Sequence, residues 1–138
     1  MEKVIFEEGH CYTRDDIHKK LGGGKVWFLP TVNGKVVCGC FCCKINPEAP
    51  KAVLVGSGKI RESTAEQLYR QREEKPVPVF LRNAGNGCIG NKLEYAGTYR
   101  AIGLTRDRKV IEEFKPGAGE ETAMVLNPNP RPGVANGR

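Results

Sequence analysis

The chain has 138 residues, of which 39% are hydrophobic and 28% charged, and its formal net charge at pH 7 is +6. This length and composition indicate one globular domain that can bury a core of its own. The positive excess is compatible with a polyanionic partner such as a nucleic acid but does not require one.

No apolar run approaches the roughly 18 to 20 residues that a transmembrane helix needs. The first eight residues lack the cationic segment and apolar stretch of a secretory signal peptide. We therefore expect a cytoplasmic protein with no membrane partner, whose six cysteines are reduced. Four of them crowd into positions 38–43, which is a poor arrangement for stapling distant segments.

The first half of the chain contains one clear helix and one clear hairpin. Thr13 and Asp16 have the spacing of a helix N-cap with a capping box, and the glycines from Gly22 onward end the helix. Asn33-Gly34 joins two strands within residues 25–43, because a type I′ turn favours this dipeptide. Short strands are also predicted at residues 4–7 and 52–55.

The second half alternates a helix with strands. A helix is predicted over residues 60–72, because apolar residues recur on one face until Pro76 stops it. Strands follow at 77–82, 93–104, 110–114 and 122–126, with Gly97 marking a bend, a bulge or a close backbone approach. The sequence thus predicts a single α+β domain over residues 1–126, with a curved, mostly antiparallel sheet or small barrel and two flanking helices. Residues 127–138 are predicted to be a disordered tail or linker.

The cysteine cluster allows three interpretations. Strand alternation places Cys38, Cys40 and Cys42 on one face, where free thiols pack as small hydrophobic groups, and we favour this core interpretation. A metal site is the second, and its candidate ligands are Cys38, Cys40, Cys43 and Cys88. A reactive thiol is the third, although neither His10 nor His18 is well placed as its base.

Tyrosines on the long strand suggest a different chemistry. Tyr95 and Tyr99 share a face by period two, with Gly97 leaving a gap between them where a flat group could lie. A base stacked on such a ring gains about 1–3 kcal/mol in single-strand binders. The alternative is that these are core tyrosines and that the neighbouring arginines are simply solvated.

Several segments together carry a resemblance to a known family. They are residues 12–23, 28–30, 33–37, 46–50, 78–82 and 94–100. They resemble a small accessory domain found with modification-dependent restriction endonucleases of bacteria and in fungal proteins. The Tyr95-x-Gly97-x-Tyr99 strand is also similar to strands of PUA-like folds, the superfamily of EVE, YTH and SRA domains, several of which read a modified base.

The resemblance implies a DNA-binding domain that flips a modified base into an aromatic pocket. Trp27, Tyr95 and Tyr99 would stack on the base, and Asn83 or Asp107 would read its edge. Arg82, Lys25 and Arg14 would hold the backbone. The partners implied are DNA or RNA and a nuclease subunit or domain, with no cofactor and no catalytic residue in this chain.

Two further functions remain open from the sequence. One is a small zinc- or thiol-dependent enzyme that uses the cysteines at 38–43. The other is a protein–protein interaction module that docks through the Asn33-Gly34 hairpin or an edge strand. The sequence favours a non-enzymatic, nucleic-acid-binding domain over both.

Overall fold

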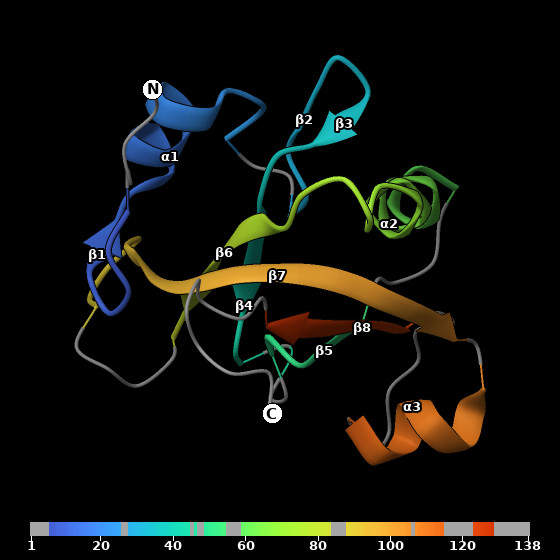
Figure 1. The fold of residues 1–138 in the computed structure, drawn as a ribbon. Coiled ribbons are helices and arrows are strands. Elements are labelled where there is room, and N and C mark those ends of the chain that lie inside the picture. Colours follow the sequence, from blue (N-terminus) through green and yellow to red (C-terminus); the bar gives the residue numbers. More distant parts are fainter. Residues whose placement is uncertain are drawn as a thin grey trace, which may run out of the picture.

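A computed structural model describes residues 6–25, 28–44, 46, 49–54, 59–83, 88–105, 107–114 and 123–128. The chain is α+β, as predicted (Figure 1). Its elements in order are β1 (Cys11–Tyr12), α1 (Arg14–Leu21), β2 (Thr31–Val32), β3 (Lys35–Val36), β4 (Gly39–Cys42), β5 (Ala52–Leu54), α2 (Lys59–Arg70), β6 (Val77–Arg82), β7 (Leu93–Thr105), α3 (Arg108–Phe114) and β8 (Ala123–Pro128).

The main sheet is mixed and largely antiparallel. Its strand order is β4-β6-β7-β8-β5, and β1 also pairs with β7. Only the β4–β6 pair is parallel among these described pairs. Figure 1 shows β7 as a long, curved strand that runs from β1 at one end to α3 at the other. The predicted curved sheet is therefore confirmed.

Two apolar clusters cover the two faces of this sheet. Alternation along β6 sends Val77, Val79 and Leu81 to one cluster, which also contains Leu68 of α2. Phe80 points to the opposite cluster. That second cluster contains Ile17 of α1, so α1 and α2 pack on opposite faces.

The capping box at the start of α1 is present as predicted. The Asp16 backbone N–H donates to Thr13 Oγ1 at 3.0 Å, and the Thr13 N–H donates to Asp16 Oδ2 at 3.0 Å. Ile17 anchors the helix with 1% of its surface exposed. Gly22 follows the last helical residue, and its φ is 83°. Glycine adopts such a positive φ readily, so it is well suited to end the helix.

The predicted Asn33-Gly34 hairpin is also present, but its arms are short. Both turn residues have positive φ, 53° and 81°, as a type I′ turn requires. The strands β2 and β3 contain two residues each. The cysteine-bearing segment does not continue the hairpin as expected, because β4 pairs in parallel with β6 instead.

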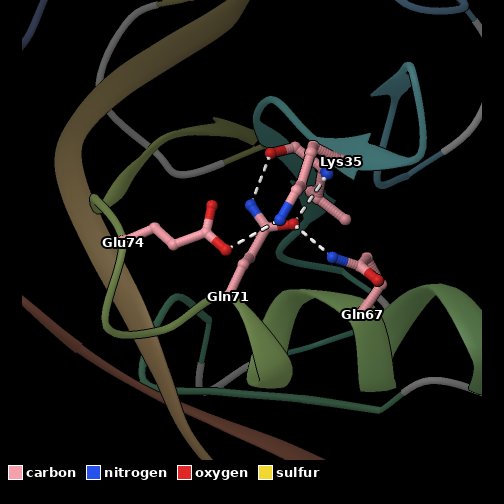
Figure 2. Close-up of polar contacts among 5 residues, drawn as sticks. Lys35, Gln67, Gln71 and Glu74 are labelled. Carbon is pink, nitrogen blue, oxygen red and sulfur yellow. Dashed lines mark hydrogen bonds and ion pairs between the residues drawn. The ribbon is translucent and has the colours of Figure 1, made fainter.

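Gln71, the residue directly after α2, braces this hairpin through its side chain. The Val36 N–H donates to Gln71 Oε1 at 3.0 Å, and Gln71 Nε2 donates to the Val36 carbonyl at 2.9 Å. Gln67 Nε2 donates to the same Gln71 Oε1 at 3.0 Å (Figure 2). The Gln71 side chain thus occupies the position that a neighbouring strand would take beside β3.

The C-terminal third differs from the prediction in one element. Residues 108–114 form a helix, not a strand, because Asp107 caps them: the Lys109 N–H donates to Asp107 Oδ1 at 2.9 Å. The predicted strand at 122–126 is confirmed as β8, which extends to Pro128, so the predicted boundary at residue 126 falls inside a strand.

At the N-terminal end, residues 4 and 5 of the predicted strand at 4–7 lie outside the described residues, and residues 6 and 7 do not form a strand. The first described strand is β1, which the sequence did not predict. No helix in the described part of the chain has the length and hydropathy needed to cross a bilayer.

Candidate functional site

Three of the residues predicted to hold a phosphate backbone surround one hollow. Arg14 comes from the start of α1, Lys25 from the loop after α1, and Arg82 from the end of β6. The hollow has a volume of about 550 Å³. Its other lining residues are Thr13, Asp15 and Asn91. We call these six residues the basic pocket.

The local structure explains why these three cations meet. Arg82 lies two residues after Phe80 on β6, so both side chains point to the face that α1 covers. Arg14 directly follows the N-cap of α1, and its Nη2 donates to the Gly24 carbonyl at 3.2 Å. That hydrogen bond draws the loop after α1 back toward the start of the helix and brings Lys25 with it.

The charge of the basic pocket is positive. Lys25 Nζ lies 3.1 Å from Asp15 Oδ1 in an exposed ion pair, which solvent screens strongly. Arg82 forms no ion pair with any described residue, and its buried Nε has no acceptor among them. Three cations therefore face one carboxylate, and the arginine charge at the end of β6 is not neutralised by the described protein groups.

The prediction that the side chains of Tyr95 and Tyr99 lie on the same face of the sheet is wrong. Along β6 and β7, Val79 pairs with Gly97 while Phe80 pairs with Tyr95, so Ala96 is an extra residue in β7. Such a β-bulge reverses the alternation of side chains on either side of it. Tyr95 therefore packs with the cluster on the α1 face, whereas Tyr99 packs with the cluster on the α2 face.

Each tyrosine is partly buried and packs against one of the two apolar clusters. The Tyr95 ring lies 5.3 Å from Phe80 and 5.6 Å from Phe6, measured between centroids. Burial raises the pKa of both Tyr95 and Tyr99. Glu8 occupies the space beside Gly97, since a Cβ there would lie 3.2 Å from Glu8 Oε2. The gap that was expected between the rings is thus absent from this part of the structure.

The remaining predicted residues have different locations. Asn83 directly follows Arg82, is exposed, and donates through Nδ2 to Cys42 Sγ at 3.4 Å. Asp107 caps α3, at the end of β7 farthest from β1, so it cannot join the basic pocket (Figure 1). Trp27 lies outside the described residues.

The prediction that every cysteine is reduced is wrong for one pair. Cys11 and Cys88 form a disulfide, with their Cα atoms 5.7 Å apart and a sequence separation of 77. Cys11 lies two residues before Thr13, and Cys88 lies three residues before Asn91. The disulfide thus joins the two segments that carry these pocket residues.

The four cysteines of the alternative metal site are not gathered. Cys88 is bonded to Cys11, and Cys43 packs against the opposite cluster from Cys38 and Cys40. Within the described residues, no group of three or more metal-binding side chains is present. The core interpretation is confirmed for Cys38 and Cys40, which are 0% and 7% exposed.

Cys38 and Cys40 nevertheless differ in acidity. A hydrogen bond from Cys38 lowers the pKa of the Cys40 thiol against the opposing effect of burial, and Arg14 and Arg82 assist. The same pairing raises the pKa of Cys38. The contacts described for the two histidines are with Glu7 and with the Gly23 carbonyl, not with a thiol, so neither is positioned as a base.

Thr13, Asp15 and Asn91 are pocket residues that the sequence reasoning missed. The N-cap pattern identified Thr13 only as a helix-start residue, although a helix start also presents free N–H groups. Asn91 had no local signal, because the disulfide that brings its loop to α1 cannot be deduced from cysteine spacing. Comparisons with protein-family models, with characterised proteins and with solved structures find no match for this chain.

Proposed function

We propose that this chain is a nucleic-acid-binding domain that holds a backbone phosphate in the basic pocket. The observation that supports the proposal is the convergence of Arg14, Lys25 and Arg82 from three separate segments around one hollow. Positively charged side chains that the fold brings together around one hollow can bind a single phosphate group. Positive charges spread over the whole surface would not form such a site.

Each lining group has a use in this function. A guanidinium group donates two parallel hydrogen bonds to phosphate oxygens, and an ammonium group supplies a compact point charge. A bound phosphate would replace Asp15 as the partner of Lys25. The main contribution to affinity would come from release of counterions from the nucleic acid.

Recognition of a modified base remains a prediction. Tyr95 and Tyr99 cannot form one stacking pocket, because they lie on opposite faces of the sheet. Two residues, Asn83 and Asp107, were predicted to read the base. Of these, Asn83 is exposed and directly follows Arg82 of the basic pocket, so we propose Asn83 for this role.

Binding measured across a salt series tests the proposal. Fluorescence anisotropy with plain duplex DNA, methylated duplex, single-stranded DNA and RNA should show affinity that falls linearly with salt on logarithmic axes. Arg14→Gln and Arg82→Gln should each weaken binding and reduce that slope by about 1. Lys109→Gln removes the same charge from α3 and should change neither quantity.

Three results would reject the proposal. The first is no binding of any of the four ligands at low salt. The second is binding whose salt slope is the same in Arg14→Gln, Arg82→Gln and Lys109→Gln, since the phosphate would then lie elsewhere. The third is equal affinity for heparin and for every nucleic acid, because the pocket would then bind polyanions in general.

A further inference from the structure

A second hollow lies at the other end of α1 and has a different character. It also has a volume of about 550 Å³, and it lies between the end of α1, β3, the loop after α2 and the start of β6. We propose that this hollow binds a small amphipathic anion, meaning an apolar body that carries one carboxylate, sulfonate or phosphate group. We call it the lysine-rimmed groove.

The floor of the groove is apolar. Val36 and Val77 are 2% and 3% exposed, and Leu21 and Pro78 lie beside them, half-buried. Pockets that bind small molecules typically have volumes of about 300–1,000 Å³ and mostly apolar walls. The floor and the volume therefore suit a ring system or a short hydrocarbon chain.

The groove is formed before any ligand binds. Gln71 holds both backbone polar groups of Val36, and Gln71 is itself only 5% exposed (Figure 2). These bonds fix β3 against the C-terminal end of α2. The floor is thus rigid, and binding would not need to order it first.

The rim is positively charged. Lys20, Lys35 and Lys75 come from three different segments and all line the groove. Neither Lys20 nor Lys75 forms an ion pair with any residue that the structure describes. Three ammonium groups and the single carboxylate of Glu74 over an apolar floor are complementary to a molecule that is apolar at one end and anionic at the other.

Glu74 already forms an ion pair with one of these three lysines. Lys35 Nζ lies 2.7 Å from Glu74 Oε2, and the two side chains are 51% and 56% exposed (Figure 2). A ligand anion must therefore compete with Glu74 for Lys35. It follows that removing the Glu74 charge should strengthen binding, an effect that a purely apolar ligand would not show.

Titration of the full chain with anilinonaphthalene sulfonate, a fluorescent amphipathic anion, tests the inference. We expect saturable binding with one site per chain. Glu74→Gln should tighten it by about twofold to fivefold, and Lys75→Gln should weaken it by about the same factor, as exposed charges do. Lys109→Gln is the matched control on α3 and should have no effect. Circular dichroism verifies that each variant is folded.

Competition experiments define the ligand class. Laurate should displace the dye, whereas acetate lacks the apolar body and dodecanol lacks the charge, so neither should displace it. Arg82→Gln should leave dye binding unchanged, which separates this inference from the proposed function. Dye binding that does not saturate, or that is equal in Glu74→Gln, Lys75→Gln and Lys109→Gln, would overturn the inference, as would displacement by dodecanol equal to that by laurate.

Discussion

The side-chain amide of Gln71 satisfies both the N–H and the carbonyl group of Val36, at 3.0 and 2.9 Å. Gln71→Met keeps the length of the side chain but leaves two buried backbone groups without partners. Because each such group costs about 1–3 kcal/mol, we expect the free energy of unfolding to fall by about 2–4 kcal/mol. Urea denaturation measures this loss.

Gln67→Met is the matched control for that substitution. Gln67 donates to Gln71 Oε1 but to neither backbone group of Val36, so its replacement should cost about 1 kcal/mol or less. Equal losses in the two variants would show that Gln71 does not support the hairpin.

The charge of Asp16 should make part of the stability depend on pH. The hydrogen bond from the Thr13 N–H lowers the pKa of Asp16 below its ordinary value of 3.8. The unfolded chain therefore binds this proton more readily than the folded chain. The resulting stability is fully present above pH 3.8 and is lost as the pH falls through the lower folded pKa.

Asp16→Asn isolates this contribution from the other carboxylates. We expect the variant to be less stable than the parent at about pH 6, and the difference to shrink toward about pH 3. Urea midpoints at both pH values provide the comparison. A difference that stays constant with pH would mean that the Asp16 charge has no part in the capping box.

Gly97 should tolerate substitution poorly. Its φ is 106°, and an added Cβ would lie 3.2 Å from Glu8 Oε2. We expect Gly97→Ala to destabilise the fold by about 1–3 kcal/mol, because a side chain strains this backbone conformation. Gly103 on the same strand has open space around it, so Gly103→Ala should change stability by no more than about 1 kcal/mol. Thermal unfolding would distinguish the two, and a harmless Gly97→Ala would argue against the bulge.

The Cys11–Cys88 disulfide should contribute substantially to stability. It joins cysteines with a sequence separation of 77, and removing a cross-link of this kind typically costs about 2–4 kcal/mol. We expect that loss when both cysteines are replaced by serine, or when a thiol reductant is added to the parent. Reductant should have no further effect on the double variant. Alkylation followed by mass spectrometry under non-reducing conditions would reveal whether the bond is absent.

Local patterns in the sequence predicted much of the fold correctly. The capping box of Thr13 and Asp16 and the turn at Asn33-Gly34 depend on residues within four positions of each other, and both are present. Residues 108–114 were misassigned because a short apolar run such as Val110-Ile111 fits a strand or a helix equally well. The cap formed by Asp107 was the signal that could have decided between them.

Contacts between distant segments could not be predicted in the same way. Nothing near β4 indicates that it pairs with β6, and one extra residue at Ala96 was enough to separate Tyr95 from Tyr99. The same holds for the candidate site, where the residues could be named from the sequence but their contacts could not. Its three cations were predicted from the family resemblance, but their meeting in one pocket depends on the sheet and on the loop after α1.

The strand order has a consequence for how the chain folds during synthesis. β5 lies at an edge of the sheet, where its partner is β8, the last described strand to leave the ribosome. The second half of β7 also pairs with β8. A nascent chain that lacks this final segment therefore exposes two unpaired backbone edges, which can recruit other chains. β8 must therefore leave the ribosome before the facing edges of β5 and β7 are both covered.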